Sequence, residues 1–420
     1  MPHRPVRVVI LGINYAPEPT GIAPYTTGLA IGLVKRGHEV LVLTGQPHYP
    51  YWKRDKASSR FRSEVRMDGV RVRRLSHPVP RRLSWIGRAA MEVTFGLQLL
   101  TTRWGQPDVV ICVTPPLLAA AMSAVRTRLT WRRPALGMLV QDLYSSGIAE
   151  TGAASGVTAR ALRLVESLAM RMCDGVSVIH TGFIRDLTED LGVGTQRIRE
   201  IRNWTHIDPP DPSASAAFRH AHGWEGDEII VLHAGNIGYK QGLENVVAAA
   251  ELAARTNSRA RFVLLGDGNQ RTSLQAKAVG VSALEFLPPV NEDEFPAALG
   301  AADVLLVNER PGVAQMSVPS KLTSYFSSGT PILAATDASG LTAGELAASG
   351  AGVRIPADRP DLMLREAIRL GTDRDLGRLL GEAGRRYCGK LLSQEAALDR
   401  YEQWVVDLAD MRRAGSGSGT

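Results

Sequence analysis

The sequence predicts an α/β protein made of two doubly wound domains, each with a mostly parallel sheet between layers of helices. Short apolar runs typical of buried parallel strands alternate with helix-length segments along almost the whole chain. One Pro- and Asp-rich stretch near residue 210 interrupts this alternation, which then resumes. With 420 residues and 44% hydrophobic content, the chain can fill two or three domain cores.

The elements follow from local patterns. Strands are predicted at 7–11, 38–44, 70–74, 109–113, 136–140, 175–179 and 198–202, and again at 228–233, 261–265, 284–287, 304–307, 331–335 and 352–355. Helices are predicted at 26–36, 86–100, 117–129, 158–172, 362–370, 376–388 and 394–411. The resulting domains span residues 1–205 and 226–393, joined by a linker at 206–225. A C-terminal helix at 394–412 and a flexible tail at 413–420 complete the chain.

Charge is distributed unevenly along the chain. The net charge is +7, but residues 1–215 carry 28 Lys and Arg against 17 Asp and Glu. Such a basic region attracts anionic lipid headgroups or polyphosphates. The alternative is that the charge only keeps the protein soluble. No nucleic-acid recognition motif accompanies it, so nucleic acid is not an expected partner.

Cysteine usage and the first residues indicate the compartment. The three cysteines are far apart and lack metal-ligand spacing, as expected for reduced thiols in a cytoplasm. The N-terminal residues run directly into the first strand, so we expect neither a signal peptide nor a spanning helix there. We therefore expect a cytoplasmic protein and no metal site.

Residues 318–334 contain the strongest candidate for an anion site. Pro319 suits the first turn of a helix that Gly329 ends, and a buried strand follows. Ser320 and Lys321 lie in that first turn, where unpaired N–H groups and the helix dipole favour a phosphate. An ordinary helix of an α/β domain is the alternative.

In each domain, one glycine-rich loop follows the first strand. Gly21 in the loop at 12–25 lets the backbone approach a phosphate or sugar, although a merely structural turn is the alternative. The loop at 233–245 carries Lys240, which can reach an anion, and Gly235 keeps the backbone open beside it. Because no GxGxxG is present, a dehydrogenase-type dinucleotide fold is disfavoured. Three such features favour a cleft that binds one phosphorylated ligand between the domains.

At this point the sequence resembles a known family. The motifs that carry the resemblance are Gly12-Ile-Asn-Tyr-Ala-Pro-Glu-Pro-Thr-Gly21, Arg36-Gly-His-Glu-Val40, Gln46-Pro-His-Tyr-Pro50, Asn203-Trp204, Gly235-Asn-Ile-Gly238, Lys240-Gln-Gly-Leu-Glu244, Gly266-Asp-Gly268 and Val318-Pro-Ser-Lys-Leu322. In order and spacing they resemble glycosyltransferase family 4, and look most like its colanic-acid biosynthesis branch. The resemblance runs from about residue 7 to about residue 400.

The resemblance implies a GT-B fold, two Rossmann-like domains that face each other across a cleft. The first domain would bind the acceptor, the second would hold the nucleotide-sugar, and the C-terminal helix would cross back to the first. It also implies a retaining glycosyltransferase of the hexosyltransferase type that needs neither metal nor cofactor. Helix N-termini and cations would stabilise its diphosphate leaving group.

Individual roles are carried over by position. The resemblance places Lys240, Lys321, Asp142 and His48 as the catalytic candidates, with Asp142 and His48 on the acceptor side. The candidates for donor binding are Gly21, Gly235, Asn236, Lys240, Gln241, Gly266, Leu287, Pro288, Ser320, Lys321 and Ser324. Among these, Leu287 and Pro288 would hold the nucleobase through backbone and apolar contacts.

Two departures from the family pattern stand out. The family's usual Glu-x7-Glu pair falls on Met316 and Ser324, so both carboxylates are absent. The usual Arg and Lys of the phosphate loop are replaced by Asn236 and Gln241. Glu309 and its neighbour Arg310 could replace the missing carboxylate or cation, or could form a surface ion pair.

The expected partners are a nucleotide-sugar donor, a saccharide or lipid-linked acceptor, and an anionic membrane surface. Residues 81–100 join three arginines and Trp85 to an apolar run, so this helix could lie at the inner membrane face or pack as a core helix. Two further functions stay open. A nucleotide-sugar epimerase would need carboxylate pairs that the sequence lacks, and a binding protein without catalysis would fit the lost glutamates.

Overall fold

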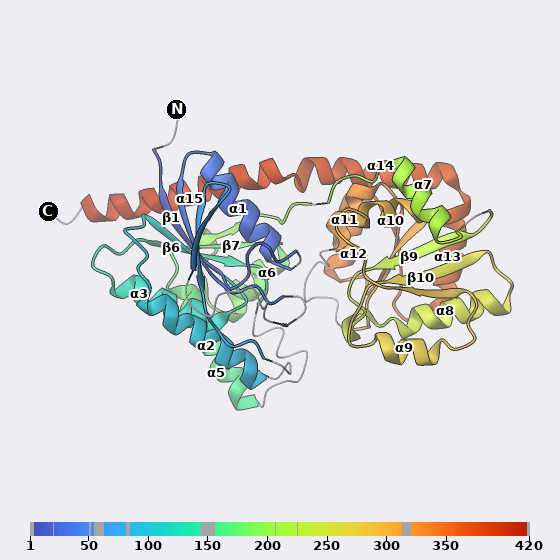
Figure 1. Cartoon of the computed structure of the whole chain (residues 1–420), viewed down its shortest axis with the longest axis horizontal. Coiled ribbons are helices and arrows are strands. Elements are labelled where there is room, and N and C mark those ends of the chain that lie inside the picture. The colour runs from blue at the N-terminus through green and yellow to red at the C-terminus, as the bar shows by residue number, and fades with distance from the viewer. Residues whose placement is uncertain are drawn as a thin grey trace. The chain divides into compact units, whose positions relative to one another are not determined.

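The computed structural model describes residues 4–19, 21–49, 52–53, 63–80, 85–143, 156–205, 207–224, 226–312 and 321–417. The chain divides into two compact units (Figure 1). The first unit contains Met1–Asn203 and Gln394–Thr420, and the second contains Trp204–Ser393. Each unit is described by itself below.

The first unit is built on a long sheet with helices on both faces (Figure 1). Its strands are β1 (Arg7–Leu11), β2 (Glu39–Gly45), β3 (Ser63–Met67), β4 (Val70–Leu75), β5 (Val109–Val113), β6 (Ala135–Val140), β7 (Gly175–Val178) and β8 (Ile198–Glu200). Its helices are α1 (Ala23–Lys35), α2 (Trp85–Thr101), α3 (Leu117–Leu129), α5 (Gly156–Arg171), α6 (Gly182–Arg185) and α15 (Gln394–Gly417), with short η1 (Asp186–Asp190) and η2 (Thr195–Arg197).

The sheet of the first unit has the order β3-β4-β2-β1-β5-β6-β7-β8 and is parallel except for the β3–β4 pair. Alternate residues of each strand point to opposite faces of the sheet. Because helices cover both faces, the central strands are apolar throughout. Val9 and Leu11 point to the face covered by α2, α3 and α5, where they pack with Phe95 and Met170. The strand order reverses at β1 and β5, so the loops after them lie at the topological switch point.

Helix α15 packs on β5 and β6 and beside α1. Trp404 is 2% exposed, and its indole lies against the backbone of two strand glycines, Gly137 of β6 and Gly175 of β7. A Cβ on Gly137 would lie 2.7 Å from the Trp404 ring, so a larger residue there would push the helix outward. The C-terminal helix is therefore part of the core of the first unit.

The second unit repeats the plan with one sheet (Figure 1). Its strands are β9 (Ile229–Ala234), β10 (Ala260–Leu265), β11 (Leu284–Leu287), β12 (Val304–Asn308), β13 (Ile332–Ala335) and β14 (Gly352–Ile355). Its helices are α7 (Pro212–Ala221), α8 (Glu244–Arg255), α9 (Arg271–Lys277), α10 (Phe295–Ala301), α11 (Lys321–Ser328), α12 (Leu341–Ser349), α13 (Pro360–Thr372) and α14 (Arg374–Leu391), with short η3 (Tyr239–Gln241).

All strand pairs of the second sheet are parallel, in the order β11-β10-β9-β12-β13-β14. Two apolar clusters fill its faces: Leu232 and Val307 pack with Tyr325 and Phe326 of α11, while Val231 and Leu306 pack with α8 and α13. The switch point lies between β9 and β12. The predicted fold class, two α/β units with mostly parallel sheets, is confirmed.

Two predicted details differ from the structure. The stretch at 206–225, predicted as a linker, contains α7, which Asp211 caps by accepting from the backbone N–H of Ala214 at 2.8 Å. This helix packs so closely on α10 that a Cβ on Gly300 would lie 2.3 Å from Ser215 Oγ, and it belongs to the second unit. Sequence analysis also missed β3, an exposed edge strand whose residues lack an apolar pattern.

Candidate functional site

The Lys321 side chain reaches the end of β9 from the first residue of α11. Its Nζ lies 3.2 Å from Nε2 of His233, and Gly235 leaves room beside it, because a Cβ there would be 3.9 Å from Nζ. His233 is fully buried, and burial together with the Lys321 charge holds its pKa well below the usual value. Burial also lowers the pKa of Lys321 to about 7. Nε2 of His233 also lies 3.3 Å from the carbonyl oxygen of Asn236, so its role as donor or acceptor depends on which ring nitrogen holds the proton.

Tyr325 fixes α11 in the position that brings Lys321 to this point. It follows Lys321 by four residues, so the two side chains lie on the same helix face. The Tyr325 hydroxyl accepts from the backbone N–H of Ala234 at 2.9 Å, and the ring is fully buried. Sequence analysis missed Tyr325, although its spacing from Lys321 was a usable signal.

Glu309 follows β12 directly, and its carboxylate is the charged group that acts on the pKa of Lys321. Its oxygens accept hydrogen bonds from the hydroxyls of Thr336 and of Thr342, the latter at 2.6 Å. Burial raises the pKa of Glu309, although both hydroxyls and Lys321 act against this rise. The Glu309 charge in turn raises the pKa of Lys321, opposing the effect of burial. Glu309 is therefore held inside this end of the sheet and is no simple surface ion pair.

The loop after β9 is held in shape by amide groups. Gln241 Oε1 accepts from the backbone N–H of Gly238 at 3.1 Å, so this side chain folds back onto its own loop. Nδ2 of buried Asn308 donates to the carbonyls of Gln241 and Gly242 at 2.7 and 2.9 Å. Lys240 and Asn236 are exposed on the same loop. The structure thus gives Gln241 a loop-shaping contact and leaves Lys240 and Asn236 accessible.

Gly266 lies where two strand ends come closest. Its φ is +138°, and a Cβ would lie 1.9 Å from the carbonyl oxygen of Gly235. Only glycine fits such a backbone approach. The contact fixes the end of β10 beside the loop after β9, so Gly266 shapes the site whether or not it touches a ligand.

The remaining second-unit candidates are spread over the same edge of the sheet. The Leu287 side chain is buried, and its carbonyl already accepts from Gly266 N at 3.1 Å and Arg271 Nη1 at 2.8 Å. Pro288 is exposed, and Ser324 is buried one turn into α11. Ser320 and Met316 lie outside the described residues. The roles assigned to these residues stay predictions.

In the first unit, the buried carboxylate of Glu18 connects the loops that follow β1 and β2 through hydrogen bonds. One carboxylate oxygen accepts from the backbone N–H groups of His48 and Tyr49 at 2.7 and 2.9 Å, and the other accepts from Asn14 at 2.8 Å. The His48 ring is 4% exposed, and its Nδ1 lies 3.0 Å from the Gln46 carbonyl. Gly21 is exposed with φ +71°, and a Cβ there would lie 3.0 Å from the Tyr49 ring. Sequence analysis missed Glu18, the residue that joins these two motifs.

Two other groups lie at the carboxyl edge of the first sheet. Asp142, just after β6, is exposed, and its neighbour Gln141 exchanges two hydrogen bonds with Asn203 at 2.7 and 3.1 Å. His180, just after β7, is 4% exposed and packs on Phe183 with ring centroids 4.0 Å apart. Neither His180 nitrogen has a hydrogen-bond partner among the described residues, and burial lowers its pKa to about 4. His180 is thus a neutral polar group that sequence analysis did not single out.

The described residues contain neither a metal-ligand cluster nor a membrane-spanning helix. The described residues hold no cluster of three His, Cys, Asp or Glu side chains suited to a metal ion. Within the described part of the chain, no helix is both long enough and apolar enough to cross a membrane.

The two sheet units have the fold of GT-B glycosyltransferases, and the family models matched by the sequence make the chain a glycosyltransferase of that type. The chain belongs to glycosyltransferase family 4 and is similar to its colanic-acid biosynthesis branch. Residues 20–204 match the family model described as "Glycosyl transferase 4-like domain", and residues 215–387 match "Glycosyl transferases group 1".

Individual relatives agree with this assignment. WcaI of Escherichia coli (strain K12), named for colanic acid biosynthesis glycosyl transfer, is 30% identical over 334 residues, covering 77% of this chain and 82% of its own. Sucrose-phosphate synthase from Thermosynechococcus elongatus is similar in structure, with a TM-score of 0.73, 17% identity and coverage of 96% and 99%. Anabaena HepE, solved in complex with UDP, gives a TM-score of 0.69 at 13% identity, with coverage of 94% and 98%. The two structural likenesses concern the fold.

Proposed function

We propose that this glycosyltransferase moves a sugar from a nucleotide diphosphate donor to a lipid-linked or polysaccharide precursor, with retention of anomeric configuration and without a metal or cofactor. We further propose that it acts in the cytoplasm, at the inner face of the membrane. The observation that supports donor binding most is the Lys321 ammonium, on a partly exposed side chain, beside Gly235 at the switch point of the second sheet. HepE, a structural neighbour, binds UDP and UDP-glucose, which is the same class of ligand.

In this proposal the second unit stabilises the leaving diphosphate. When the bond between the anomeric carbon and the diphosphate oxygen breaks, negative charge grows on that oxygen. A lysine already fixed by His233 and Tyr325 needs little rearrangement to face this charge, which is electrostatic preorganisation. Lys240 on the adjacent loop adds a second, accessible cation. The acceptor oxygen bonds to the anomeric carbon on the face that the diphosphate leaves, and its proton passes to the departing diphosphate oxygen. Asp142 and His48 are the predicted residues on the acceptor side.

Glu309 replaces part of what the absent Glu-x7-Glu pair provides in other family members. Its place after β12 and its two threonine partners hold one carboxylate near Lys321. We propose that Glu309 keeps Lys321 charged.

The test is a transfer assay with a panel of nucleotide-sugars and saccharide or lipid-linked acceptors, run with and without EDTA. We expect one donor to yield free nucleoside diphosphate and an α- or β-linked product that keeps the donor configuration, at a rate that EDTA does not change. Loss of activity in EDTA would overturn metal independence, and an inverted product would overturn retention. A donor converted to its epimer with no acceptor consumed would make the protein an epimerase. Tight donor binding without turnover would make it a binding protein.

A further inference from the structure

The Nδ1 atom of His48 faces two hydrogen-bond acceptors. It lies 3.0 Å from the carbonyl oxygen of Gln46 and 3.3 Å from Oε1 of Glu18. A carbonyl and an ionised carboxylate only accept hydrogen bonds, so both attract a proton on Nδ1 and both repel a lone pair there. The uncharged ring therefore carries its proton on Nδ1 and its lone pair on Nε2.

Nε2 of His48 is the ring nitrogen left for a ligand. Within the described part of the chain it has no hydrogen-bond partner, and it is not fully enclosed, whereas both nitrogens of His180 are. The side chain of His48 is only 2% exposed, so packing restricts the rotation of its ring. A fixed ring with one open acceptor atom selects a group that donates a hydrogen bond, as a hydroxyl does.

The carboxylate of Glu18 is fixed before any ligand arrives. Its oxygens accept from the backbone N–H groups of His48 and Tyr49 at 2.7 and 2.9 Å, and from the Asn14 side chain at 2.8 Å. Its side chain is 2% exposed, so salt screens its charge little. In this position beside Nδ1, Glu18 orients the imidazole, as the buried carboxylate of a catalytic triad does.

Aromatic rings border His48. The ring centroids of Trp52 and His77 lie 5.5 and 4.9 Å from its own, both edge-on. Trp52 has φ +50°, a left-handed backbone that is uncommon for a bulky residue and that clusters at functional sites. The Arg88 guanidinium of α2 lies 5.3 Å from the Trp52 ring centroid. Aromatic rings around a few fixed polar atoms are the usual lining of a small-molecule site.

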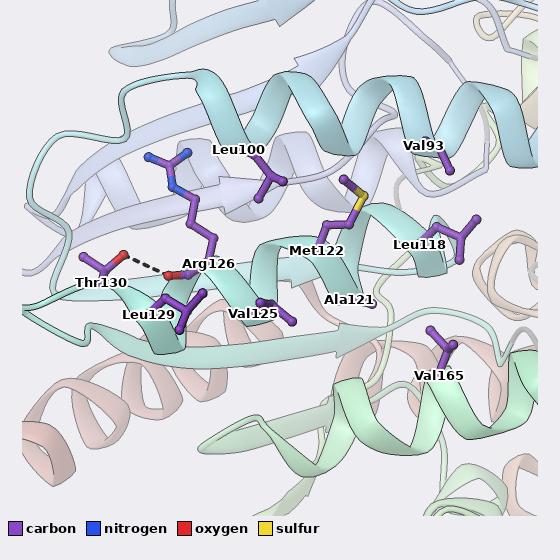
Figure 2. Close-up of a pocket in the computed structure, with 10 residues that line it drawn as sticks. All are labelled: Val93, Leu100, Leu118, Ala121, Met122, Val125, Arg126, Leu129, Thr130 and Val165. Atoms are coloured by element: carbon purple, nitrogen blue, oxygen red, sulfur yellow. Dashed lines mark hydrogen bonds between the residues drawn. The ribbon is translucent and has the colours of Figure 1, made fainter.

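Helix α2 supports this cluster. Its residues Met91, Phe95 and Leu99 pack into the core, as the core-helix interpretation of residues 81–100 predicted, and the Phe95 ring lies 6.3 Å from that of His77. Other residues of α2 line an apolar groove of about 620 Å³ together with α3 and α5 (Figure 2). That groove shares no residue with the His48 cluster, so the two are separate features.

We propose that Glu18 is a positioning residue of the acceptor site, which holds His48 with its proton on Nδ1, so that Nε2 accepts a hydrogen bond from a hydroxyl of the acceptor saccharide. A lone pair beside aromatic rings fits a sugar hydroxyl and offers nothing to a phosphate oxygen, which is itself an acceptor. The bonded hydroxyl is a neighbour of the one that reacts, whose proton passes to the leaving diphosphate. This inference rests on the proposed sugar transfer, and its test includes readouts that need no transfer.

Nitrogen-15 spectra of the full chain, labelled in histidine only, identify the protonated ring nitrogen. His48→Asn assigns the signals, and about pH 8.5 keeps an ordinary histidine neutral. We expect the Nδ1–H form in the wild type and a shift toward the Nε2–H form in Glu18→Gln, because the amide lacks the charge that holds the proton. The methyl α-glycosides of glucose, galactose and mannose serve as probes. At least one of them should move the Nε2 signal of the wild type and not that of Glu18→Gln.

Acceptor kinetics separate the two ring nitrogens. With the donor and acceptor found by the transfer assay, Glu18→Gln and His48→Asn should each raise the acceptor KM about three- to tenfold, the effect of one lost hydrogen bond. His48→Asn keeps a donor near the place of Nδ1 and has no acceptor at Nε2, whereas His48→Gln has an amide oxygen that can reach the place of Nε2. His48→Gln should therefore keep more acceptor affinity than His48→Asn. Nucleoside diphosphate affinity, measured by calorimetry, should stay unchanged in all three variants.

Glu92→Gln on α2 is the matched control. Glu92 is 5% exposed, as Glu18 is, and its carboxylate likewise accepts from a backbone N–H, that of Leu118 at 3.0 Å. This variant should change neither the protonation of His48 nor the acceptor KM. Far-ultraviolet circular dichroism checks that every variant is folded.

Three outcomes would reject the role of Glu18. They are an Nε2–H form of His48 in the wild type, a His48 signal that none of the glycosides moves, and equal rises in acceptor KM for Glu18→Gln and Glu92→Gln. A wild-type protein that transfers no sugar would contradict the proposed function instead. In that case the protonated nitrogen and the glycoside-induced shift still decide whether Glu18 prepares His48 for a saccharide.

Discussion

Nζ of Lys321 lies 3.2 Å from Nε2 of His233, a residue 88 positions earlier that is fully buried at the end of β9. Burial holds the His233 pKa well below its usual value, so the ring is neutral at pH 7. The lysine has a pKa of about 7 and can be charged or neutral there. A diphosphate bound at this point favours the charged form, so ligand binding and protonation of Lys321 are coupled.

This coupling predicts that donor affinity depends on pH. The ligand-free pKa of Lys321 is lowered by burial to about 7, so the fraction of protein with a charged lysine falls as pH rises through 7. We expect the dissociation constant of an intact nucleotide-sugar to be lowest below about pH 6.5 and to rise about tenfold for each pH unit well above 7, until the pKa of the complex is reached. Isothermal titration calorimetry from pH 6 to pH 9 measures it. A constant affinity over that range would contradict the assignment.

Glu309→Gln should shift this pH dependence to lower pH. The Glu309 carboxylate raises the pKa of Lys321 against the effect of burial, and the amide removes that charge with little change in shape. At pH 7 a smaller fraction of Lys321 would be charged, so donor binding weakens, whereas near pH 5.5 the variant should approach the wild type. Asp375→Asn on α14, whose carboxylate side chain is 96% exposed, serves as the control. An unshifted profile would leave Glu309 a purely structural residue.

Lys321→Met should weaken donor binding and raise the free energy of unfolding. Keeping the ammonium charged inside the unit costs free energy, so an apolar side chain of similar length should stabilise the fold by about 1–4 kcal/mol. The gain should be full at and below about pH 7 and shrink as pH rises toward 10.5, because the lysine of the unfolded chain then also loses its proton and the two states bind the same number of protons. Donor binding should weaken about ten- to a hundredfold. Denaturant unfolding and calorimetry measure the two effects.

Exposed Lys240 supplies the comparison for Lys321. Lys240→Ala should weaken donor binding on the same scale, about ten- to a hundredfold, with no gain in stability, because Lys240 is an exposed residue and its removal relieves no burial. Lys321→Arg should not restore affinity, since a planar guanidinium does not replace the compact ammonium beside His233. If neither alanine nor methionine changes nucleotide affinity, the donor binds elsewhere.

Gly266→Ala should destabilise the second unit by about 2–5 kcal/mol. The added Cβ would lie 1.9 Å from the Gly235 carbonyl oxygen, so the two strand ends must separate. Gly280→Ala is the matched control, because φ there is +84° but nothing lies within 4 Å. It should cost only about 1 kcal/mol for the left-handed backbone. Equal losses in both variants would show that backbone strain, and not the close approach, decides.

Trp404→Ala should destabilise the first unit by about 3–5 kcal/mol, because it empties a site packed against β6 and β7. Hydrogen exchange followed by mass spectrometry separates the units. Protection should fall in β6 and β7 and stay unchanged in β9 and β12. Trp224→Ala, which removes a fully buried indole of the second unit, should give the opposite pattern. Loss of protection in both units of either variant would mean that they unfold together.

The sequence by itself determined the two-unit plan and most of the order of strands and helices, with β3 and α7 as exceptions. Buried parallel strands such as Val109–Val113 are apolar throughout, and helix signals such as Gly329 are local, so both are visible without the fold. It also indicated the loops that meet at each sheet edge, because strand ends and glycines are local features. The family motifs added the reaction class and the prediction that Lys321 contacts the donor diphosphate.

Only the tertiary structure decided which groups surround Lys321. Its neighbours His233 and Glu309 come from other strand ends, and the low pKa depends on burial that packing alone creates. The same holds for α7, whose sequence resembles a linker until it packs on α10. It also holds for Glu18 and His48, which lie 30 positions apart and meet only in the folded unit. Burial and proximity are properties of contacts between segments far apart in the chain, and local periodicity does not encode them.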